Sequence, residues 1–403
     1  MAVIVQKYGG SSVADVDKLL QIAKKISEEK KSGNDVVVVV SAMGKSTDTL
    51  IDLAKSISKD PQKREMDMLL SVGERTTMSL LCMALNDLGV DAISLTGSQA
   101  GIITNDRHND ARVIEVRPFR ILDEIANNKV VVVGGFQGVS YKRDITTLGR
   151  GGSDTSAVAL AAALNAERCE IYSDVDGVYT ADPSVIKGAV HLPELSYEIM
   201  QEMSESGAKV LNAQAVQFAK EANIAIYARK SFGGKKETIV RVMAAGLSRG
   251  VKAVVHENQI ARISFGGGEM QKNFSDLLKY AEQKQYKIKE IYFSAHEINT
   301  SNSKVGLLLS LKNIIDWESA KNELREYFNN INIEPGLGAV SLIGDGINRD
   351  NSILLSSIKL LEDNKIKIFG ISTTSFRISF LLSDENIKFS AQIFHQKWIE
   401  EIS

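Results

Sequence analysis

The sequence predicts an α/β protein, an αβα sandwich on an open and mostly parallel sheet, followed by two small α+β modules. Three observations lead to this fold class. Up to about Val242, short β-rich apolar runs alternate with stretches of helical periodicity; glycine-rich loops lie between strand and helix; and the last third contains an internal repeat. Continuous apolar runs are typical of strands that helices cover on both faces.

Six apolar runs are the expected strands of the large sheet: residues 2–5, 36–40, 92–95, 130–133, 170–172 and 224–227. A helix is expected after Asp15, where apolar residues recur at helical spacing from Val16 to Ile26. Another helical stretch begins near Met66 and continues through Leu81. This βαβα order predicts ligand binding at the carboxyl ends of the strands.

The C-terminal third contains two copies of one strand–loop–helix–strand module, offset by 78 residues. Residues 261–265 align with 339–343, and residues 287–289 align with 365–367. We therefore expect three domains, at 1–248, 249–335 and 336–403. Either the two modules follow one another, or one is inserted into the other. A repeated module beside a larger domain suggests a sensor or a dimerisation platform.

The composition excludes several classes of protein. The chain of 403 residues has 48 basic and 50 acidic side chains, so no excess of positive charge favours a nucleic acid or an anionic membrane as partner. The apolar start is too short for a signal peptide, and no apolar run suggests a membrane helix. Cys82 and Cys169 lie in apolar runs typical of buried, reduced thiols, and the five histidines lack metal-ligand spacing. We expect a cytoplasmic protein that binds small ligands.

A nucleotide phosphate site is predicted at residues 148–154. Gly149, Gly151 and Gly152 can adopt positive φ and bring backbone N–H groups close to an anion. Ser153 and Asp154 then start an Ala- and Leu-rich run typical of a helix. The helix would be followed by the strand 170–172 and by a polar turn that lines the crevice at the strand end.

A second glycine loop follows the first expected strand, with the sequence Lys7-Tyr8-Gly9-Gly10-Ser11-Ser12. A lysine beside two glycines and two hydroxyls suits the charge that develops on a transferring phosphoryl group. A strand-to-helix turn with a solvated lysine is the alternative.

An acceptor with amino acid character is suggested by Ser41, Thr47, Glu74 and Arg150. An arginine can hold a carboxylate through two hydrogen bonds, a glutamate can hold an ammonium, and hydroxyls can orient a second carboxylate. Each residue taken alone is more typical of a helix cap or a surface position.

These motifs together resemble the aspartokinases of the amino acid kinase superfamily, in the monofunctional form with C-terminal ACT domains. The resemblance extends over nearly the whole chain, through six segments in the family's order: residues 7–12, where the family usually has KFGGTS, 41–45, 101–112, 148–154, 173–183 and 207–211. Tyr8 and Ser11 are conservative departures. Ser184 stands where the family commonly has arginine, which leaves one nucleotide contact open, and Lys230 replaces a serine.

The resemblance implies ATP-dependent phosphorylation of the side-chain carboxylate of L-aspartate to 4-phospho-L-aspartate, the first step towards lysine, threonine and methionine. Mg²⁺ would be held mainly through the nucleotide, with no ligand directly from the protein. The implied catalytic residues are Lys7 and Asp154. The implied ATP-binding residues are Lys7, Gly9, Gly10, Ser11, Gly152, Ser173, Asp174, Tyr179 and Asp182. The implied aspartate-binding residues are Ser41, Thr47, Glu74, Arg150 and Ser153.

The repeated modules would be ACT domains, which in relatives pair between subunits and bind an end-product amino acid. The resemblance therefore implies a homodimer or higher oligomer, with feedback inhibition by lysine, alone or with threonine. The implied effector residues are Phe265, Met270, Ser294 and Glu297. Two alternatives stay open: a kinase of the same fold that phosphorylates glutamate, acetylglutamate or a nucleoside monophosphate, and a catalytically silent amino-acid sensor.

Overall fold

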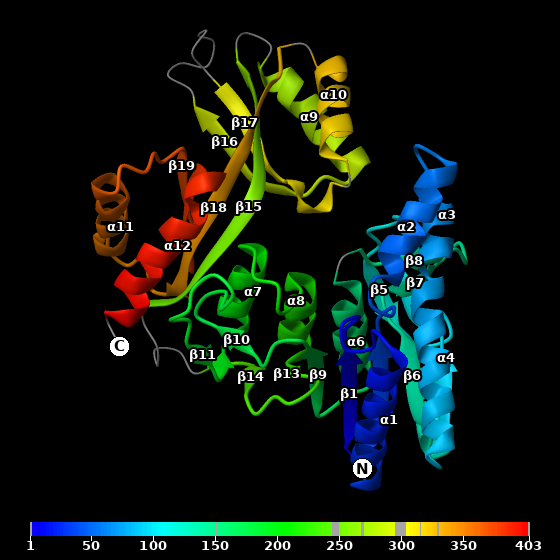
Figure 1. Ribbon diagram of the computed structural model, residues 1–403. Coiled ribbons are helices and arrows are strands. Elements are labelled where there is room, and N and C mark those ends of the chain that lie inside the picture. The colour runs from blue at the N-terminus through cyan, green and yellow to red at the C-terminus, as the bar shows by residue number, and fades with distance from the viewer. Residues whose placement is uncertain are drawn as a thin grey trace. The chain divides into compact units, whose positions relative to one another are not determined.

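The computed structural model describes residues 2–149, 151–243, 250–266, 270–294, 304–314, 316–328 and 330–401. The chain forms two compact units (Figure 1). The first unit comprises Met1–Tyr179 and Val190–Leu247, and the second comprises Thr180–Ala189 and Ser248–Ser403. Ten residues that lie within the first unit in sequence therefore belong to the second unit in space.

An eight-stranded sheet forms the centre of the first unit, and the α/β fold with a mostly parallel sheet is confirmed. Its strands, in order across the sheet, are β12 (Glu194–Leu195), β14 (Glu237–Val240), β13 (Ile226–Lys230), β9 (Arg168–Ser173), β1 (Val3–Tyr8), β2 (Asp35–Val40), β6 (Val130–Gly134) and β3 (Ala92–Leu95). All neighbours pair in parallel except β13 and β14. The six predicted strands are the six consecutive strands from β13 to β3.

Helices cover both faces of this sheet. On one face, α1 (Val16–Lys31) and α4 (Val72–Asp87) pack side by side, and their apolar residues share a buried cluster with Tyr8 and Val38 (Figure 1). The helix α1 begins after Asp15 as the sequence predicts, and Asp15 is its N-cap, since its side chain accepts a hydrogen bond from the Lys18 N–H. On the other face, α6 (Gly152–Ala163) packs against β1, β2 and β9, and α8 (Ala213–Ala222) with α7 (Tyr197–Glu205) packs beside it.

A smaller four-stranded sheet and four short elements complete the first unit. The sheet has the order β5 (Val113–Val116), β4 (Ile102–Thr104), β7 (Gln137–Ser140) and β8 (Ile145–Thr147). The other elements are α2 (Ser46–Ile57), α5 (Phe119–Ala126), β10 (Val178–Tyr179) and β11 (His191–Leu192).

The helical stretch expected from Met66 to Leu81 is two helices, α3 (Lys63–Leu70) and α4, which meet at Ser71. By length and composition alone, the stretch Lys63–Asp87 passes as a membrane span, which the sequence had not suggested. Just over half of its most apolar window (56%) is buried inside the fold, as in the core helix of a globular unit. Leu81 and Leu85, for example, are fully buried in the cluster against the large sheet.

The second unit is built on a six-stranded antiparallel sheet. Its order is β16 (Ile288–Ser294), β17 (Lys304–Ser310), β15 (Gly250–Gly266), β18 (Asn332–Asp345), β20 (Arg377–Ser383) and β19 (Gly370–Thr373). Its helices are α9 (Met270–Lys284), α10 (Trp317–Tyr327), α11 (Ser352–Asp363) and α12 (Ile387–His395), and the turn η3 (Gln396–Glu400) extends α12; the short 3₁₀ turns η1 (Leu311–Asn313) and η2 (Asp384–Asn386) follow β17 and β20.

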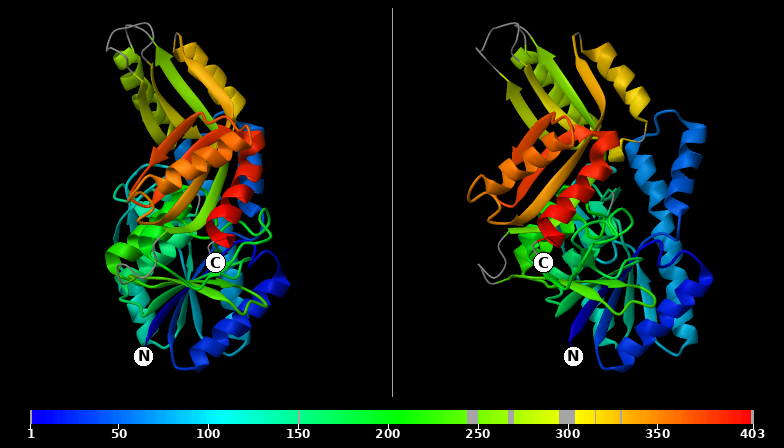
Figure 2. Two further views of the ribbon diagram at one scale, coloured as in Figure 1. Left: turned by 90° about the vertical axis from the view of Figure 1, so that its left-hand side faces the viewer. Right: turned by 60° about the vertical axis from the view of Figure 1, so that its left-hand side comes forward.

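The two long central strands serve two separate cores (Figure 2). Ile263 near the end of β15 packs in one core with residues of α9 and α10. Val254 near the start of β15 packs in the other core with residues of β18, α11 and α12. Segments that precede and follow the first repeated module in sequence thus pack in the same core. The segment 180–189 belongs to this second core, where Ala181 and Ile186 are buried.

Candidate active site

A lysine and an aspartate meet where β1 ends and α6 begins. Lys7 lies one residue before the end of β1, and the alternation of side chains along the strand directs it to the face that α6 covers. Its Nζ lies 2.6 Å from Oδ1 of Asp154, which is in the first turn of α6. The two side chains are only 12% and 10% exposed, so a fixed positive charge is held in a mostly dry position beside a helix N-terminus.

The loop that carries Gly9 and Gly10 packs closely on the loop after β2. A Cβ at Gly10 would lie 2.9 Å from the carbonyl oxygen of Ala42, and the Gly44 N–H donates to the Gly10 carbonyl at 3.0 Å. A side chain at Gly10 would therefore separate the two loops. At Gly9 a Cβ would lie 3.4 Å from Nζ of Lys7. Ser11 is exposed at the surface of this loop.

The glycine loop predicted at residues 148–154 precedes α6, as expected. Gly149 (φ 71°) and Gly151 (φ 74°) are left-handed, which residues other than glycine rarely adopt. Gly152 differs from the expectation: it is the first residue of α6, and what restricts it is space, since a Cβ would lie 2.7 Å from Cβ of Leu148. Gly151 is the N-cap and offers no side-chain cap. The N–H groups of Gly152 and Asp154 donate to the carbonyls of Gly149 and Gly151, each at 3.0 Å, so the helix dipole rather than these N–H groups would favour an anion here.

Glu74 is buried against the loop after β2. The preceding residue, Gly73, would bring a Cβ within 2.7 Å of Cβ of Ala42, so glycine permits this close contact. One carboxylate oxygen of Glu74 accepts the Ala42 N–H at 3.1 Å. The other oxygen is buried, and nothing in the described part of the chain bonds to it. Burial raises the pKa of Glu74 to about 7, and a cation beside this oxygen would lower it.

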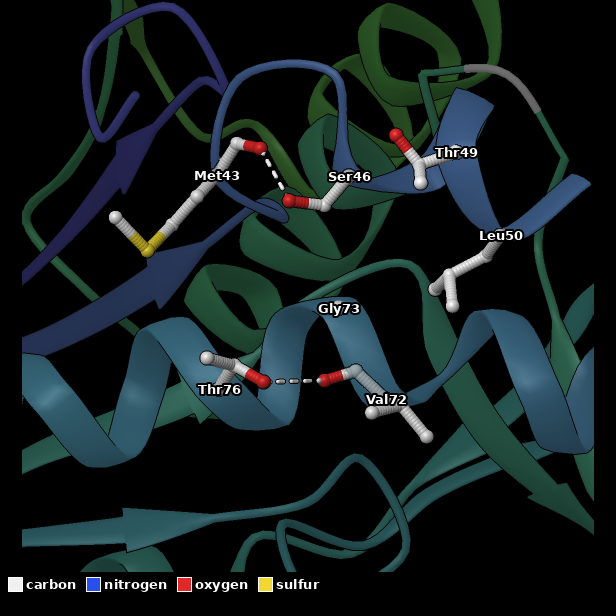
Figure 3. A pocket seen from close by; sticks show the side chains of 7 residues that line it. All are labelled: Met43, Ser46, Thr49, Leu50, Val72, Gly73 and Thr76. Atoms are coloured by element: carbon white, nitrogen blue, oxygen red, sulfur yellow. Dashed lines mark hydrogen bonds between the residues drawn. The ribbon is translucent and has the colours of Figure 1, made fainter. Parts of the chain in front are cut away.

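A cavity of about 240 Å³ opens between α2 and the start of α4 (Figure 3). Its lining residues are Met43, Ser46, Thr49, Leu50, Val72, Gly73 and Thr76. Ser46 and Thr76 direct their hydroxyls to the carbonyl oxygens of Met43 and Val72, at 2.6 and 3.1 Å. The surface of the cavity is thus mostly apolar, and the charged residue Glu74 directly follows the lining residue Gly73 in sequence.

The remaining predicted acceptor residues surround the same loops. Ser41 follows β2 and is half-buried, with its N–H donating to the Tyr8 carbonyl at 3.1 Å. Thr47 is half-buried in the first turn of α2. Ser153 is buried in α6, next to Asp154. Arg150 lies outside the described residues.

The predicted nucleotide residues follow β9. Ser173 ends the strand, and its hydroxyl accepts the Val175 N–H at 3.3 Å. Asp174 is exposed. The Tyr179 hydroxyl donates to Asp176 at 2.8 Å, which fixes its ring near this turn.

Asp182 belongs to the second unit, which the chain enters at Thr180. The backbone N–H and the hydroxyl of Ser184 both donate to its carboxylate, at 2.9 and 2.6 Å. Ser184, which stands where the family commonly has arginine, is therefore a partner of Asp182.

The predicted effector residues are only partly described. Phe265 is 2% exposed and packs against Phe328 in the core with α9 and α10, so it contributes to packing. Met270 begins α9 and Ser294 ends β16. Glu297 lies outside the described residues.

Two residues near the glycine loop were not foreseen. Phe136 has φ 65°, and its carbonyl accepts the Leu148 N–H at 2.8 Å. The only signal for it in the sequence is the preceding Gly134-Gly135 pair. Asp67 is a fully buried acid in α3, and a charge among apolar helical residues was the available sign.

The fold and the two glycine loops indicate the class of protein. In agreement, the model of the amino acid kinase family matches residues 2–229. An aspartokinase of Bacillus sp. (strain MGA3) is 42% identical over 98% of this chain and 97% of its own length. Two crystal structures of E. coli aspartokinase III also match. The one with aspartate and ADP (R-state) has a TM-score of 0.80 at 23% identity, and the one with lysine and aspartate (T-state) has 0.74 at 24%; each alignment covers 98% of this chain and 99% of the other. The chain belongs to the aspartokinases of the amino acid kinase family.

Proposed function

We propose that this protein transfers the γ-phosphoryl group of ATP to the side-chain carboxylate of L-aspartate and forms 4-phospho-L-aspartate. The observation that carries this proposal is the Lys7–Asp154 pair, held at 2.6 Å between a strand end and a helix N-terminus. It supplies a fixed cation where a phosphoryl group would lie above the glycine loop. The identity of the acceptor rests on family membership.

The chemistry requires alignment and neutralisation of charge. An aspartate side chain with a pKa near ~4 is ionised at neutral pH, so the acceptor oxygen attacks without a general base. Lys7 would stabilise the negative charge on the transferring group, and Asp154 would hold the lysine in position. The positive end of the α6 dipole would favour the phosphate oxygens.

The acceptor would lie between Glu74 and the glycine loop. The unpartnered oxygen of Glu74 would bind the ammonium, and Arg150 would bind a carboxylate. Ser41, Thr47 and Ser153 would border the substrate. On the donor side, Gly9, Gly10, Ser11 and Gly152 would approach the phosphates, and Ser173, Asp174, Tyr179 and Asp182 would border the nucleotide.

Mg²⁺ would reach the site on the nucleotide. In the described part of the chain, no group of three or more His, Cys, Asp or Glu side chains could hold a metal ion. Asp154 is also engaged by Lys7. A bound Mg²⁺ would neutralise phosphate charge, and the residues of this chain would bind the nucleotide oxygens around it.

The second unit would regulate the enzyme. We expect its two ACT-type modules to pair between copies of the chain, as a homodimer or larger oligomer. Lysine, alone or with threonine, would be the effector, in line with the relative solved with lysine. Loss of activity at millimolar lysine or threonine would support this, and unchanged activity with either or both would refute it.

A cytoplasmic location accords with two buried cysteines that form no disulfide.

The test is ADP release by the purified protein with Mg-ATP, comparing L-aspartate with L-glutamate, N-acetylglutamate and UMP. Hydroxylamine added to the reaction would trap an acyl phosphate. We expect turnover and trapped product with aspartate alone. Turnover with another acceptor would keep the donor site and refute the assigned substrate, and silence with all four would favour a sensor without activity.

A further inference from the structure

Asp67 makes three contacts from a fully buried position in α3, although it lies outside the predicted active site. One of its oxygens accepts the Thr147 hydroxyl at 2.5 Å and the Asn109 N–H at 3.0 Å. The other lies 2.6 Å from Nδ1 of His108. A buried carboxylate is costly unless such partners satisfy it, so the three groups and Asp67 fix one another.

Two of these partners lead directly to the glycine loop before α6. Thr147 is the last residue of β8, two positions before Gly149. Asn109 is in a turn with φ 69°, a left-handed conformation that asparagine adopts more readily than other non-glycine residues. Gly149 packs on this turn, since a Cβ there would lie 3.4 Å from the Asn109 carbonyl oxygen and 3.2 Å from the Asp110 carboxylate.

Asp67 is also connected, through the backbone of α3, to the helix that carries Glu74. The Ser71 N–H, at the junction of α3 and α4, donates to the Asp67 carbonyl at 3.1 Å. Glu74 follows in the first turn of α4. Asp67 therefore links the helix that presents Glu74 to the loop that leads into Ser153, the two sides between which the acceptor is proposed to lie.

We propose that Asp67 is a positioning residue for the acceptor substrate, which sets the separation between the Glu74 helix and the glycine loop. This inference rests on the proposed function for the assignment of Glu74 and Ser153 to the acceptor. In the described part of the chain, the carboxylate of Asp67 contacts only Thr147, Asn109 and His108. Because the glycine loop is proposed to serve both substrates and Glu74 the acceptor alone, loss of Asp67 should affect aspartate more than ATP.

The test compares Asp67→Ala with Asp67→Asn in the full chain. For Asp67→Ala we expect the KM for aspartate to rise about tenfold or more, because a displacement near 1 Å in an oriented site is enough for such a loss. The KM for ATP should rise clearly less, because the glycine loop borders the phosphates as well, whereas Glu74 serves aspartate alone. Asparagine keeps an oxygen for Thr147 and Asn109, and its amide can face a His108 nitrogen in the accepting tautomer, so Asp67→Asn should restore most of the affinity.

Glu65→Ala is the matched control, because Glu65 is an exposed acid on the same helix, paired with Arg64. It should leave both KM values unchanged. If Asp67→Ala does not fold, Thr147→Val removes one of the three contacts at nearly constant volume and should raise the KM for aspartate more than the KM for ATP. Hydrogen exchange of the peptides over 105–112 and 147–152 should become faster in either variant, whatever the acceptor proves to be.

An unchanged KM for aspartate in folded variants, or an equal rise of both KM values, would overturn the inference. So would unchanged hydrogen exchange over both peptides. Failure of the wild-type protein to phosphorylate aspartate would instead refute the proposed function, and the KM comparison would then be made with the acceptor that is turned over. If no acceptor is turned over, the exchange measurement alone decides.

Discussion

The pKa of Glu74 allows a sharp test of the acceptor site. If only the ionised carboxylate binds the ammonium of aspartate, affinity follows the ionised fraction of Glu74 in the free enzyme. With a pKa of about 7, that fraction is roughly 9% at pH 6, 50% at pH 7 and 91% at pH 8. The Kd for aspartate should therefore fall about tenfold from pH 6 to pH 8, a range in which aspartate itself does not titrate.

Glu74→Gln removes the titration and keeps an oxygen for the Ala42 N–H. Its affinity for aspartate should be nearly constant between pH 6 and pH 8. At pH 8 it should be weaker than that of the wild type by roughly 10- to 150-fold, because a hydrogen bond to a charged group is worth about 1.5–3 kcal/mol.

Titration calorimetry is the assay, with Kd measured from pH 6 to pH 8 in buffers of different ionisation enthalpy. At pH 7 binding of aspartate to the wild type should release about half a proton, and binding to Glu74→Gln should release none. A flat profile in the wild type, or the same slope in the variant, would refute the reasoning and remove Glu74 from the ammonium site.

The same pKa predicts how stability depends on pH. The folded pKa of Glu74, about 7, lies above its ordinary value of 4.5, so folding favours the protonated form. The contribution to stability is present below pH 4.5 and is lost as pH rises to about 7, by about 3 kcal/mol at most. Urea unfolding without ligand should show a smaller loss in Glu74→Gln over this range, and equal losses in both proteins would contradict the assigned pKa.

Three further predictions concern the Lys7–Asp154 pair and the packing within each of the two units. Lys7→Ala should lower kcat at least ~100-fold with a milder change in KM, measured by ADP release, because one fixed donor to the transferring group is lost; near-normal turnover would exclude this role. Gly73→Ala should raise the KM for aspartate, since its Cβ would lie 2.7 Å from that of Ala42; an unchanged KM would show that the loop yields without consequence. Thr180→Val should cost about 1–3 kcal/mol in urea unfolding, because the Thr180 hydroxyl lies 2.8 Å from Nε2 of the fully buried His395; a cost near zero would mean that the histidine finds another partner.

Six strands of the large sheet and the two glycine loops could be predicted because their signals are local. A strand buried on both faces must be apolar at every position, which the run from Val36 to Val40 satisfies. Glycines between a strand and a helix mark positions where a side chain would clash, and Gly10 and Gly151 both prove to be such positions. The break between α3 and α4 at Ser71 left no comparable mark, since serine is tolerated within helices.

Long-range contacts account for what could not be predicted. Asp67 meets Thr147 across 80 positions of sequence, and nothing near either residue indicates the other. The transfer of 180–189 to the second unit was equally hidden, because Ala181 and Ile186 are as apolar as the residues of any core. Such features depend on which surfaces meet after folding, and a single sequence does not encode them in its periodicity.

The placement of the charges argues that the site keeps its buried charges compensated until substrates arrive. Lys7 is neutralised by Asp154 at 2.6 Å, and Glu74 is half protonated at neutral pH, so the free enzyme keeps little uncompensated charge in a buried region. Binding an ammonium would draw the proton from Glu74, and binding a phosphate would offer Lys7 a second anion. The cost of burying each charge would then be met only when its partner is present, which ties correct ionisation of the site to occupancy by both substrates.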